Sequence, residues 1–451
     1  MKIEQFEDKS LSHYSYAILS ECENEVVLID PARNISEYLD FARQHGAKII
    51  GVIETHPHAD FVSGHLELHE TTGATIYCSK LLGAIYPHQT FDDGDTISFG
   101  KITLKALNTP GHSPDSISIV LEHSAKGHAV FTGDTLFIGD CGRPDLRENA
   151  GNLTATREEL AREMYRSLHQ KLMLLNDEVI VYPAHGAGTL CGKALSEANS
   201  STIGAEKLGN WSLANLTEEQ FVKALLEDQP FVPKYFPYDV ELNKKGAAML
   251  RLSVEKVHIE KNITLETVTS KLQKEVVIID IRPAEQFKKG HLLNAINLMA
   301  NGKFETWLGS IIAPGELFYL VAGNEDQLLE VINRAAKIGY ETFIKTTFVL
   351  NSGEMKSDQL DLESFRNNPS TFQIIDIRNP NEVEEHPAFP GSLHIPLPEL
   401  RERVNEIPIK KPLVVHCAGG YRSAAGSSIL KSSLGKIIPV FDLGTAVSEF
   451  L

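Results

Sequence analysis

The chain has 451 residues, of which 42% are hydrophobic and 23% are charged, and its formal net charge at pH 7 is −17. This length exceeds what one hydrophobic core supports, so the composition predicts a globular protein of several domains. An acidic chain without a basic patch repels phosphates, and no apolar run is long enough to cross a bilayer, so we expect neither nucleic acid nor a membrane as a partner. Because no apolar leader precedes the first folded-looking residues, the expected location is the cytoplasm.

Short runs rich in β-branched residues recur through the first part of the chain. They lie at 26–30, 49–54, 102–107, 116–121, 129–134 and 179–185. Helical patterns cover 157–175 and 215–228, and an extended tail is expected over 233–239. Closely spaced strands with helices outside them predict a mixed α/β sandwich, which we assign to a first domain at 1–250.

The rest of the chain contains an internal repeat. The sequence VVIIDIR at 276–282 recurs as FQIIDIR at 372–378, so Asp280 and Asp376 lie 96 residues apart. Each copy reads strand, loop, strand, helix, which predicts a small α/β domain with a parallel sheet. The predicted domains are 258–352 and 354–451.

The five cysteines are scattered along the chain and include no CxxC pair. An odd number at irregular spacing predicts neither a disulfide framework nor a zinc knuckle. Each is expected to be a buried thiol unless its neighbours indicate reactivity. The five are Cys22, Cys78, Cys141, Cys191 and Cys417.

Histidines and aspartates follow several of the predicted strands of the first domain. Because these strands leave the sheets at neighbouring points, their side chains could all meet at one end of the sheets. A single His would more often be a surface or hydrogen-bonded core residue, but four His and two Asp at strand ends predict a metal site. They are His56, His58 and Asp60 in THPHAD, His112 in TPGHS, Asp134 in FTGD and His185 in YPAH.

These motifs, THxHxD, TPGHS, GD and YPAH in this order, resemble the metallo-β-lactamase superfamily over roughly residues 1–245. The resemblance implies an αββα sandwich with a metal site at one edge. Hydrolases of the superfamily hold two zinc ions, and their first motif usually ends in His directly after the Asp. Here that position is Phe61, and the next histidine is His65. A phenyl ring cannot coordinate a metal, so the departure argues against hydrolase chemistry.

Within the superfamily, the chain best resembles the persulfide dioxygenases. This resemblance implies one Fe(II) per chain, held by His56, His112 and Asp134. Two His and one carboxylate leave coordination positions open for a substrate sulfur and for O2. His58, Asp60 and His185 are then expected to orient the ligands or to hold water.

The sequence CGRPDL resembles the family loop that follows the Asp ligand. Arg143 is a candidate for holding a substrate carboxylate or phosphate, and the alternative is an Arg tied to a loop carbonyl or to Asp145. Cys141 lies near the site by sequence, with its role open. Glutathione-using relatives often have Asp-Tyr where this chain has Gly186-Ala187. Persulfides of glutathione, coenzyme A, cysteine or bacillithiol therefore all stay open as substrates.

Near the end of the chain, Cys417 follows an apolar strand and precedes a predicted helix. A Cys in a Gly-containing loop that opens a helix faces backbone N–H groups and the positive end of the helix dipole, which favour a nucleophilic thiolate. Arg422 adds a positive charge. We predict Cys417 and Arg422 as catalytic, and Gly419, Gly420 and Tyr421 as the loop that binds the sulfur substrate.

This Cys-x4-Arg loop resembles the active loop of the rhodaneses, and the match covers most of 354–451. The loop is shorter than that of related phosphatases, which suits sulfur better than phosphate. The middle copy has Ala322 where the Cys should be. It is expected to be an inactive rhodanese-like domain used for packing, docking or spacing.

Together the resemblances identify a bacterial persulfide dioxygenase–rhodanese fusion. They imply oxidation of a thiol persulfide with O2 to sulfite, followed by sulfur transfer through Cys417 to give thiosulfate, and family analogy implies a homo-oligomer. One alternative is a zinc-dependent thioester hydrolase of the glyoxalase II kind fused to a sulfurtransferase. A second alternative is a sulfur carrier or redox-sensing scaffold whose metal is structural.

Overall fold

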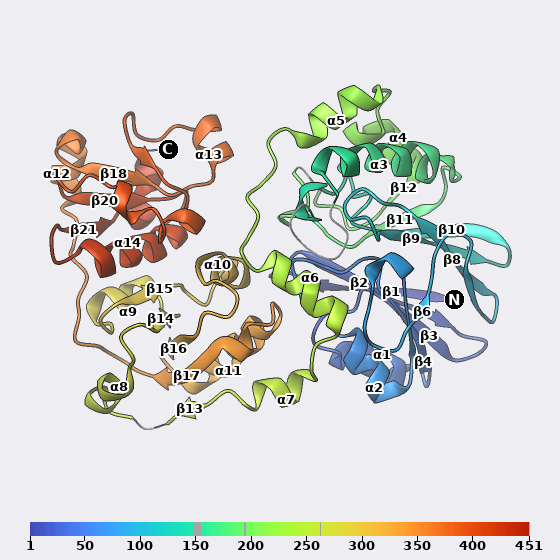
Figure 1. Cartoon of the computed structure of the whole chain (residues 1–451), viewed down its shortest axis with the longest axis horizontal. Helices are drawn as coiled ribbons and strands as arrows, with labels where there is room; N and C mark the ends of the chain where they lie inside the picture. Colours follow the sequence, from blue (N-terminus) through green and yellow to red (C-terminus); the bar gives the residue numbers. More distant parts are fainter. Residues whose placement is uncertain (148–154, 194, 262, 451) are drawn as a thin grey trace. The chain divides into compact units, whose positions relative to one another are not determined.

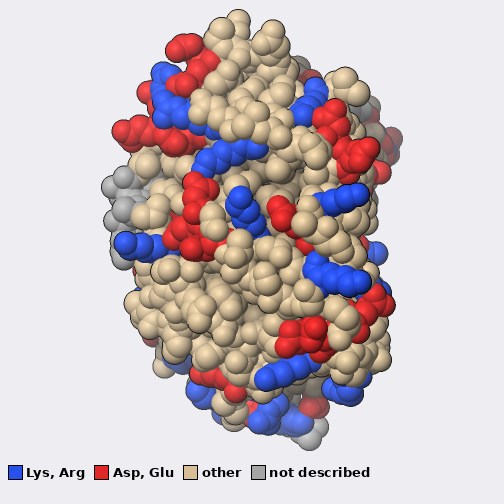
Figure 2. Space-filling model, turned by 90° about the vertical axis from the view of Figure 1, so that its right-hand side faces the viewer, with Lys and Arg blue, Asp and Glu red and all other residues tan. Residues whose placement is uncertain are grey.

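The computed structural model describes residues 1–147, 155–193, 195–261 and 263–450 (Figure 1). It divides into two compact units, Met1–Leu252 with Lys337–Gly339, and Ser253–Ala336 with Tyr340–Leu451. Among the described residues, no helix combines the length and the apolar composition needed to cross a membrane. On the face in Figure 2, Lys and Arg are interspersed with Asp and Glu.

Two six-stranded sheets form the first unit. The first sheet has the order β1 (Lys2–Asp8), β2 (His13–Ser20), β3 (Glu25–Ile29), β4 (Lys48–Ile53), β5 (Thr75–Cys78), β6 (Gln89–Thr90). The second has the order β12 (Ser201–Thr202), β11 (Ile180–Pro183), β10 (Lys126–Gly133), β9 (Ile117–His123), β8 (Ile102–Asn108), β7 (Thr96–Phe99). The helices are α1 (Ser36–Gln44), α2 (His65–Thr72), α3 (Arg157–Gln170), α4 (Ile203–Gly209), α5 (Glu218–Leu226) and α6 (Phe236–Lys245), and α7 (Leu250–Val254) crosses into the second unit.

Alternation along the strands divides the core of this unit into three layers. In β2, Tyr16 and Ile18 point between the two sheets, whereas Ala17 and Leu19 pack with residues of α1 and α2 on the outer face. On the outer face of the other sheet, Val130 packs with residues of α3 and α5. Helices therefore cover both sheets (Figure 1), and the predicted αββα sandwich is confirmed.

Two expectations about local structure need correction. The predicted helix at 157–175 ends at Gln170, and a separate 3-10 turn follows at Leu172–Leu174. The prediction of an extended tail at 233–239 is wrong, because α6 begins at Phe236. Pro237 stands in the first turn of α6, where a helix tolerates the missing N–H, so the proline begins a helix there instead of preventing one.

Two parallel sheets form the second unit, as predicted. In the middle module the order is β13 (Ile259–Glu260), β17 (Ile344–Val349), β16 (Phe318–Ala322), β14 (Val277–Asp280), β15 (Ala295–Asn297), with α8 (Leu265–Lys271), α9 (Ala284–Lys289), α10 (Phe304–Ile311) and α11 (Glu325–Ala336). In the last module the order is β19 (Leu393–His394), β18 (Gln373–Asp376), β20 (Leu413–His416), β21 (Val440–Asp442), with α12 (Leu362–Asn367), α13 (Pro380–Glu385) and α14 (Tyr421–Leu434).

Candidate metal centre and cysteine loop

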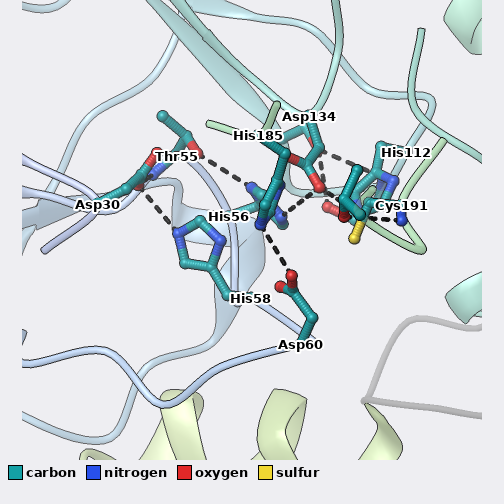
Figure 3. A network of polar contacts seen from close by, with 12 residues as sticks. Asp30, Thr55, His56, His58, Asp60, His112, Asp134, His185 and Cys191 are labelled. Atoms are coloured by element: carbon teal, nitrogen blue, oxygen red, sulfur yellow. Dashed lines mark hydrogen bonds and ion pairs between the residues drawn. The ribbon is translucent and has the colours of Figure 1, made fainter. Parts of the chain in front are cut away.

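Three of the predicted metal ligands meet at one end of the sandwich (Figure 3). His56 follows β4, His112 follows β8 and Asp134 follows β10. The Nε2 atoms of His56 and His112 lie 3.8 Å and 3.5 Å from Oδ2 of Asp134. We call His56, His112 and Asp134 the triad.

Hydrogen bonds at Nδ1 orient both imidazole rings of the triad. Nδ1 of His56 lies 3.0 Å from Oγ1 of Thr55, and Nδ1 of His112 lies 2.9 Å from the carbonyl oxygen of Arg143. These contacts leave Nε2 of each ring for the centre of the site. The buried atoms Nε2 of His56 and Oδ2 of Asp134 have no hydrogen-bond partner. Unpartnered lone pairs that converge on one point fit a metal ion.

The protonation states in the triad suit metal binding. Burial lowers the pKa of His56 and that of His112, so both rings are neutral donors. Burial alone would raise the pKa of Asp134, but the charge and hydrogen bond of His185 hold it well below its usual range. The triad therefore offers two neutral nitrogens and one anionic oxygen, a donor set that suits Fe(II) and other borderline metals.

His185 lies between two carboxylates. Its Nδ1 is 2.7 Å from Oδ1 of Asp134, and its Nε2 is 2.8 Å from Oδ2 of Asp60. Burial would lower the pKa of His185, but these two carboxylates raise it well above its ordinary value. His185 therefore positions Asp134 and carries a proton beside the triad. Asp60, His185 and the buried Cys191 also form a second group whose ligand atoms lie within 4.8 Å of one another.

His58 does not join the triad. Its Nε2 lies 3.1 Å from Oδ1 of Asp30 and 3.9 Å from Oε2 of Glu54. The ring of Phe61 packs on the ring of His58 with a centroid distance of 4.3 Å, and on His13 at 3.9 Å. The apolar ring of Phe61 therefore occupies the space beside His58. At this position the hydrolases usually have a metal-binding histidine.

Arg143 and Cys141, the two substrate-binding candidates in CGRPDL, do not present free polar groups to the triad. The guanidinium of Arg143 is buried and forms a two-point ion pair with Asp145, with both N–O distances at 2.7 Å. It also donates to the carbonyl of Leu190, so the alternative of a structural Arg is the one observed. Cys141 packs inside an apolar core cluster, where burial raises its pKa, so a substrate contact through this thiol is not supported.

Cys417 follows β20 directly and stands in a loop that opens α14. The backbone N–H of Gly420 donates to Sγ of Cys417 at 3.1 Å. Gly420 has a φ of +91°, and a Cβ there would lie 2.8 Å from the backbone carbon of Gly444, so only glycine fits. At Gly419 a Cβ would meet no atom within 4 Å, which leaves this side of the loop open to a substrate.

Residues that the sequence analysis missed hold the rest of the loop. Glu382 forms a two-point ion pair with Arg422, with both distances at 2.6 Å, and the guanidinium lies 5.5 Å from the centre of the Trp307 ring of the middle module. The hydroxyl of Tyr421 donates to the carbonyl of Met299 at 2.9 Å. The guanidinium of Arg422 still interacts with the charge of Cys417, although Glu382 neutralises much of the positive charge of Arg422. The middle module therefore contributes contacts to the loop of the last one.

Two family models match the chain: "Metallo-beta-lactamase superfamily" over residues 11–185, and "Rhodanese-like domain" over 264–351 and 358–447. The persulfide dioxygenase ETHE1 of Bos taurus is 32% identical over 234 residues, which cover 51% of this chain and 82% of the relative. A hydroxyacylglutathione hydrolase of Gloeobacter violaceus is 32% identical over 176 residues, 38% of this chain and 63% of the relative. A solved metallo-beta-lactamase from Staphylococcus aureus is similar with a TM-score of 0.67 and 30% identity, covering 77% of this chain and 99% of that one.

Proposed function

Because the chain belongs to the metallo-beta-lactamase superfamily, as a homologue of the ETHE1 persulfide dioxygenases joined to two rhodanese-like domains, we propose that it oxidises a low-molecular-weight thiol persulfide with O2 and transfers sulfane sulfur. The oxidation gives sulfite at one Fe(II) held by the triad. The transfer runs through Cys417 and gives thiosulfate. The observation that carries the proposal is a buried triad with unpartnered donor atoms beside a position, Phe61, that cannot serve a second metal.

The triad supports iron by its donor set. Fe(II) bound by two imidazoles and one carboxylate is the arrangement of non-haem oxygenases, in which open positions remain for the substrate and O2. The chain contributes the orientation: the Arg143 carbonyl holds the ring of His112, and His185 holds the carboxylate of Asp134. His185 also keeps a proton next to the reacting atoms. The oxidation balances as RSSH + O2 + H2O → RSH + SO3²⁻ + 2 H⁺.

The loop of Cys417 supports the second reaction. The Cys417 thiolate attacks the outer sulfur of a second persulfide, which breaks the S–S bond, releases RSH and leaves Cys417 as a persulfide. Sulfite then attacks the outer sulfur and leaves as thiosulfate, which restores the thiolate. The N–H of Gly420 stabilises the anionic sulfur, and the open side at Gly419 admits the two reactants.

The carrier thiol is open, and persulfides of glutathione, coenzyme A, cysteine or bacillithiol are all candidates. A cytoplasmic location and a homo-oligomer stay predictions from the sequence.

The experiment is O2 uptake by full-length protein that has been loaded with Fe(II) without air and then given a low-molecular-weight persulfide. We expect rapid uptake that needs both iron and persulfide and that is lost in His112→Ala. No uptake by protein with iron verified in the site would contradict the proposal. Hydrolysis of a thioester by zinc-loaded protein would instead support the glyoxalase II alternative. Persulfide on Cys417 without any O2 uptake would support the sulfur-carrier alternative.

A further inference from the structure

A third group of side chains that could bind a metal lies beside the triad and shares no residue with it or with the group of Asp60, His185 and Cys191. Asp30, Glu54 and His58 are all buried, and their ligand atoms lie within 4.8 Å of one another. Nε2 of His58 is 3.1 Å from Oδ1 of Asp30 and 3.9 Å from Oε2 of Glu54. Ligands about 2.0–2.2 Å from one tetrahedral ion are about 3.3–3.6 Å apart, and the two spacings lie a few tenths of an ångström on either side of this range, so small side-chain shifts would let the atoms share a cation.

His65 adds a fourth donor to this cluster. It is fully buried at the start of α2, and its Nδ1 lies 3.6 Å from Oε1 of Glu54. The ring packs on Tyr86 with a centroid distance of 4.5 Å, which holds it in place against the carboxylate. Asp30, Glu54 and His58 therefore face one another in the interior, and His65 approaches Glu54 from the start of α2.

Thr55 donates to both oxygens of Asp30, through its N–H at 2.7 Å and its hydroxyl at 2.8 Å, but most other ligand atoms of the cluster are unused. Neither ring nitrogen of His58 or of His65 has a hydrogen-bond partner, and neither does Oε2 of Glu54. The other oxygen of Glu54 accepts from Ser63 at 2.7 Å. Buried polar atoms are nearly always satisfied, so five unpartnered atoms in one place indicate a missing interaction.

A proton supplies only part of this interaction. A protonated Glu54 would donate one hydrogen bond to one histidine ring, and His58 has only the 3.1 Å approach of its Nε2 to Asp30, so the remaining ring nitrogens still lack partners. A divalent cation accepts lone pairs from a carboxylate and from both imidazoles at once, and it compensates the charge of two neighbouring carboxylates.

We propose that Asp30, Glu54, His58 and His65 hold a structural zinc ion, separate from the metal of the triad. Zinc binds imidazole nitrogens and carboxylate oxygens, and a closed, buried set of four such ligands would suit a structural ion. The ring of Phe61, packed on His58, separates this set from the space next to His185. The ion would link the end of β3 to the segment 54–65, which carries His56 of the triad. This inference does not depend on the reaction proposed above.

The experiment isolates this site by removing the triad. Full-length His112→Ala is stripped with a chelator, given Zn²⁺ alone, and analysed for bound zinc by mass spectrometry. We expect one tightly held zinc per chain. Adding Glu54→Gln should weaken zinc binding by at least about 10- to 100-fold, since a ligand matters no less than the groups that orient ligands. His69→Gln is the matched control, because His69 lies on the same helix as His65 and its ring Nδ1 donates to the Ala74 carbonyl at 2.7 Å, away from the cluster.

X-ray absorption at the zinc edge distinguishes the two candidate clusters. The proposal predicts only nitrogen and oxygen neighbours, at about 2.0–2.2 Å. A sulfur neighbour at about 2.3 Å would overturn it, because it would assign the zinc to the group with Cys191. A folded His112→Ala protein that binds no zinc, or equal zinc affinity with and without Glu54→Gln, would overturn it too. If Glu54→Gln fails to fold, His65→Gln provides the same comparison with the same expected loss.

Discussion

The two rhodanese-like modules of the second unit share a buried ion pair but differ in the loop after their central strand. Arg282 binds Asp280 with distances of 2.9 and 2.5 Å, and Arg378 binds Asp376 with distances of 3.0 and 2.6 Å. Each guanidinium also donates to carbonyls of its own module. The Asp-x-Arg spacing that the two copies share is therefore explained by a structural ion pair and does not indicate catalysis.

The two modules differ in the loop that follows the central strand. Backbone bonds to Val321 and His416 align these positions, so Ala322 stands where Cys417 does. Two residues separate Ala322 from α11, whereas three separate Cys417 from α14. In the shorter loop the side chain of Asn324 accepts the N–H of Gln327 and caps the helix, a bond that has no counterpart in the loop of Cys417. The two loops therefore differ in their backbone as well as in the sulfur, and we expect activity to depend on both.

The largest expected effect is on the shared scaffold. Asp376→Asn and Asp280→Asn each leave a buried guanidinium unpaired, which typically costs about 3–5 kcal/mol of unfolding free energy. Denaturant unfolding of each variant measures it. Because both pairs have the same geometry, we expect the two losses to be similar. A large loss in one module and none in the other would break the equivalence of the scaffolds.

A smaller effect is expected at the loop itself. Gly420→Ala forces a side chain into a left-handed conformation and against Gly444, a strain of about 1–3 kcal/mol, so sulfur transfer should fall by about 10-fold or more. Gly419→Ala is the matched control, because its Cβ enters open space, and should keep most of the activity. A thiosulfate-to-cyanide transfer assay compares the two. Equal activities would show that the loop conformation is not what the middle module lacks.

The sequence predicted the parts of these sites that lie at strand ends. His56, His112 and Asp134 each follow a β-branched run, and Cys417 lies between a strand and a helix, so local pattern was enough to place them. Glu382 lies on α13, Trp307 lies on α10 of the middle module and Cys191 lies in a loop, and only the folded chain brings them to the sites. One signal was available for Glu382: it stands six residues after Asp376, where the middle copy has Gln286 six residues after Asp280.

The acid dependence of stability should differ between the modules, because the middle module has Gln286 at the position of Glu382. Burial would raise the pKa of Glu382, but the hydrogen bond and charge of Arg422 lower it. The stabilisation from this pair is therefore complete above the carboxyl's pKa in the unfolded chain and is lost as pH falls through the lowered pKa of the folded protein. Thermal unfolding followed from pH 7 to about pH 3 should show a smaller decline in Glu382→Gln. An identical decline would contradict a stabilising pair.

The smallest effect is expected for restoring the missing cysteine. Ala322→Cys places a thiol at the end of β16, where the residue is fully buried and the loop is one residue short. In a Cys417→Ser background it should give no sulfur transfer above that background, and mass spectrometry should find no persulfide on the new cysteine. Measurable transfer would show that the sulfur atom alone distinguishes the two modules.

The most direct test of the division between the two sites is Cys417→Ser, loaded with iron and given persulfide, with O2 uptake and sulfur products measured together. The account predicts O2 uptake at the rate of the unaltered protein, with sulfite replacing thiosulfate as the product. Loss of O2 uptake, or unchanged thiosulfate formation, would contradict it, since either result would mean that oxidation and sulfur transfer are not carried by separate residues.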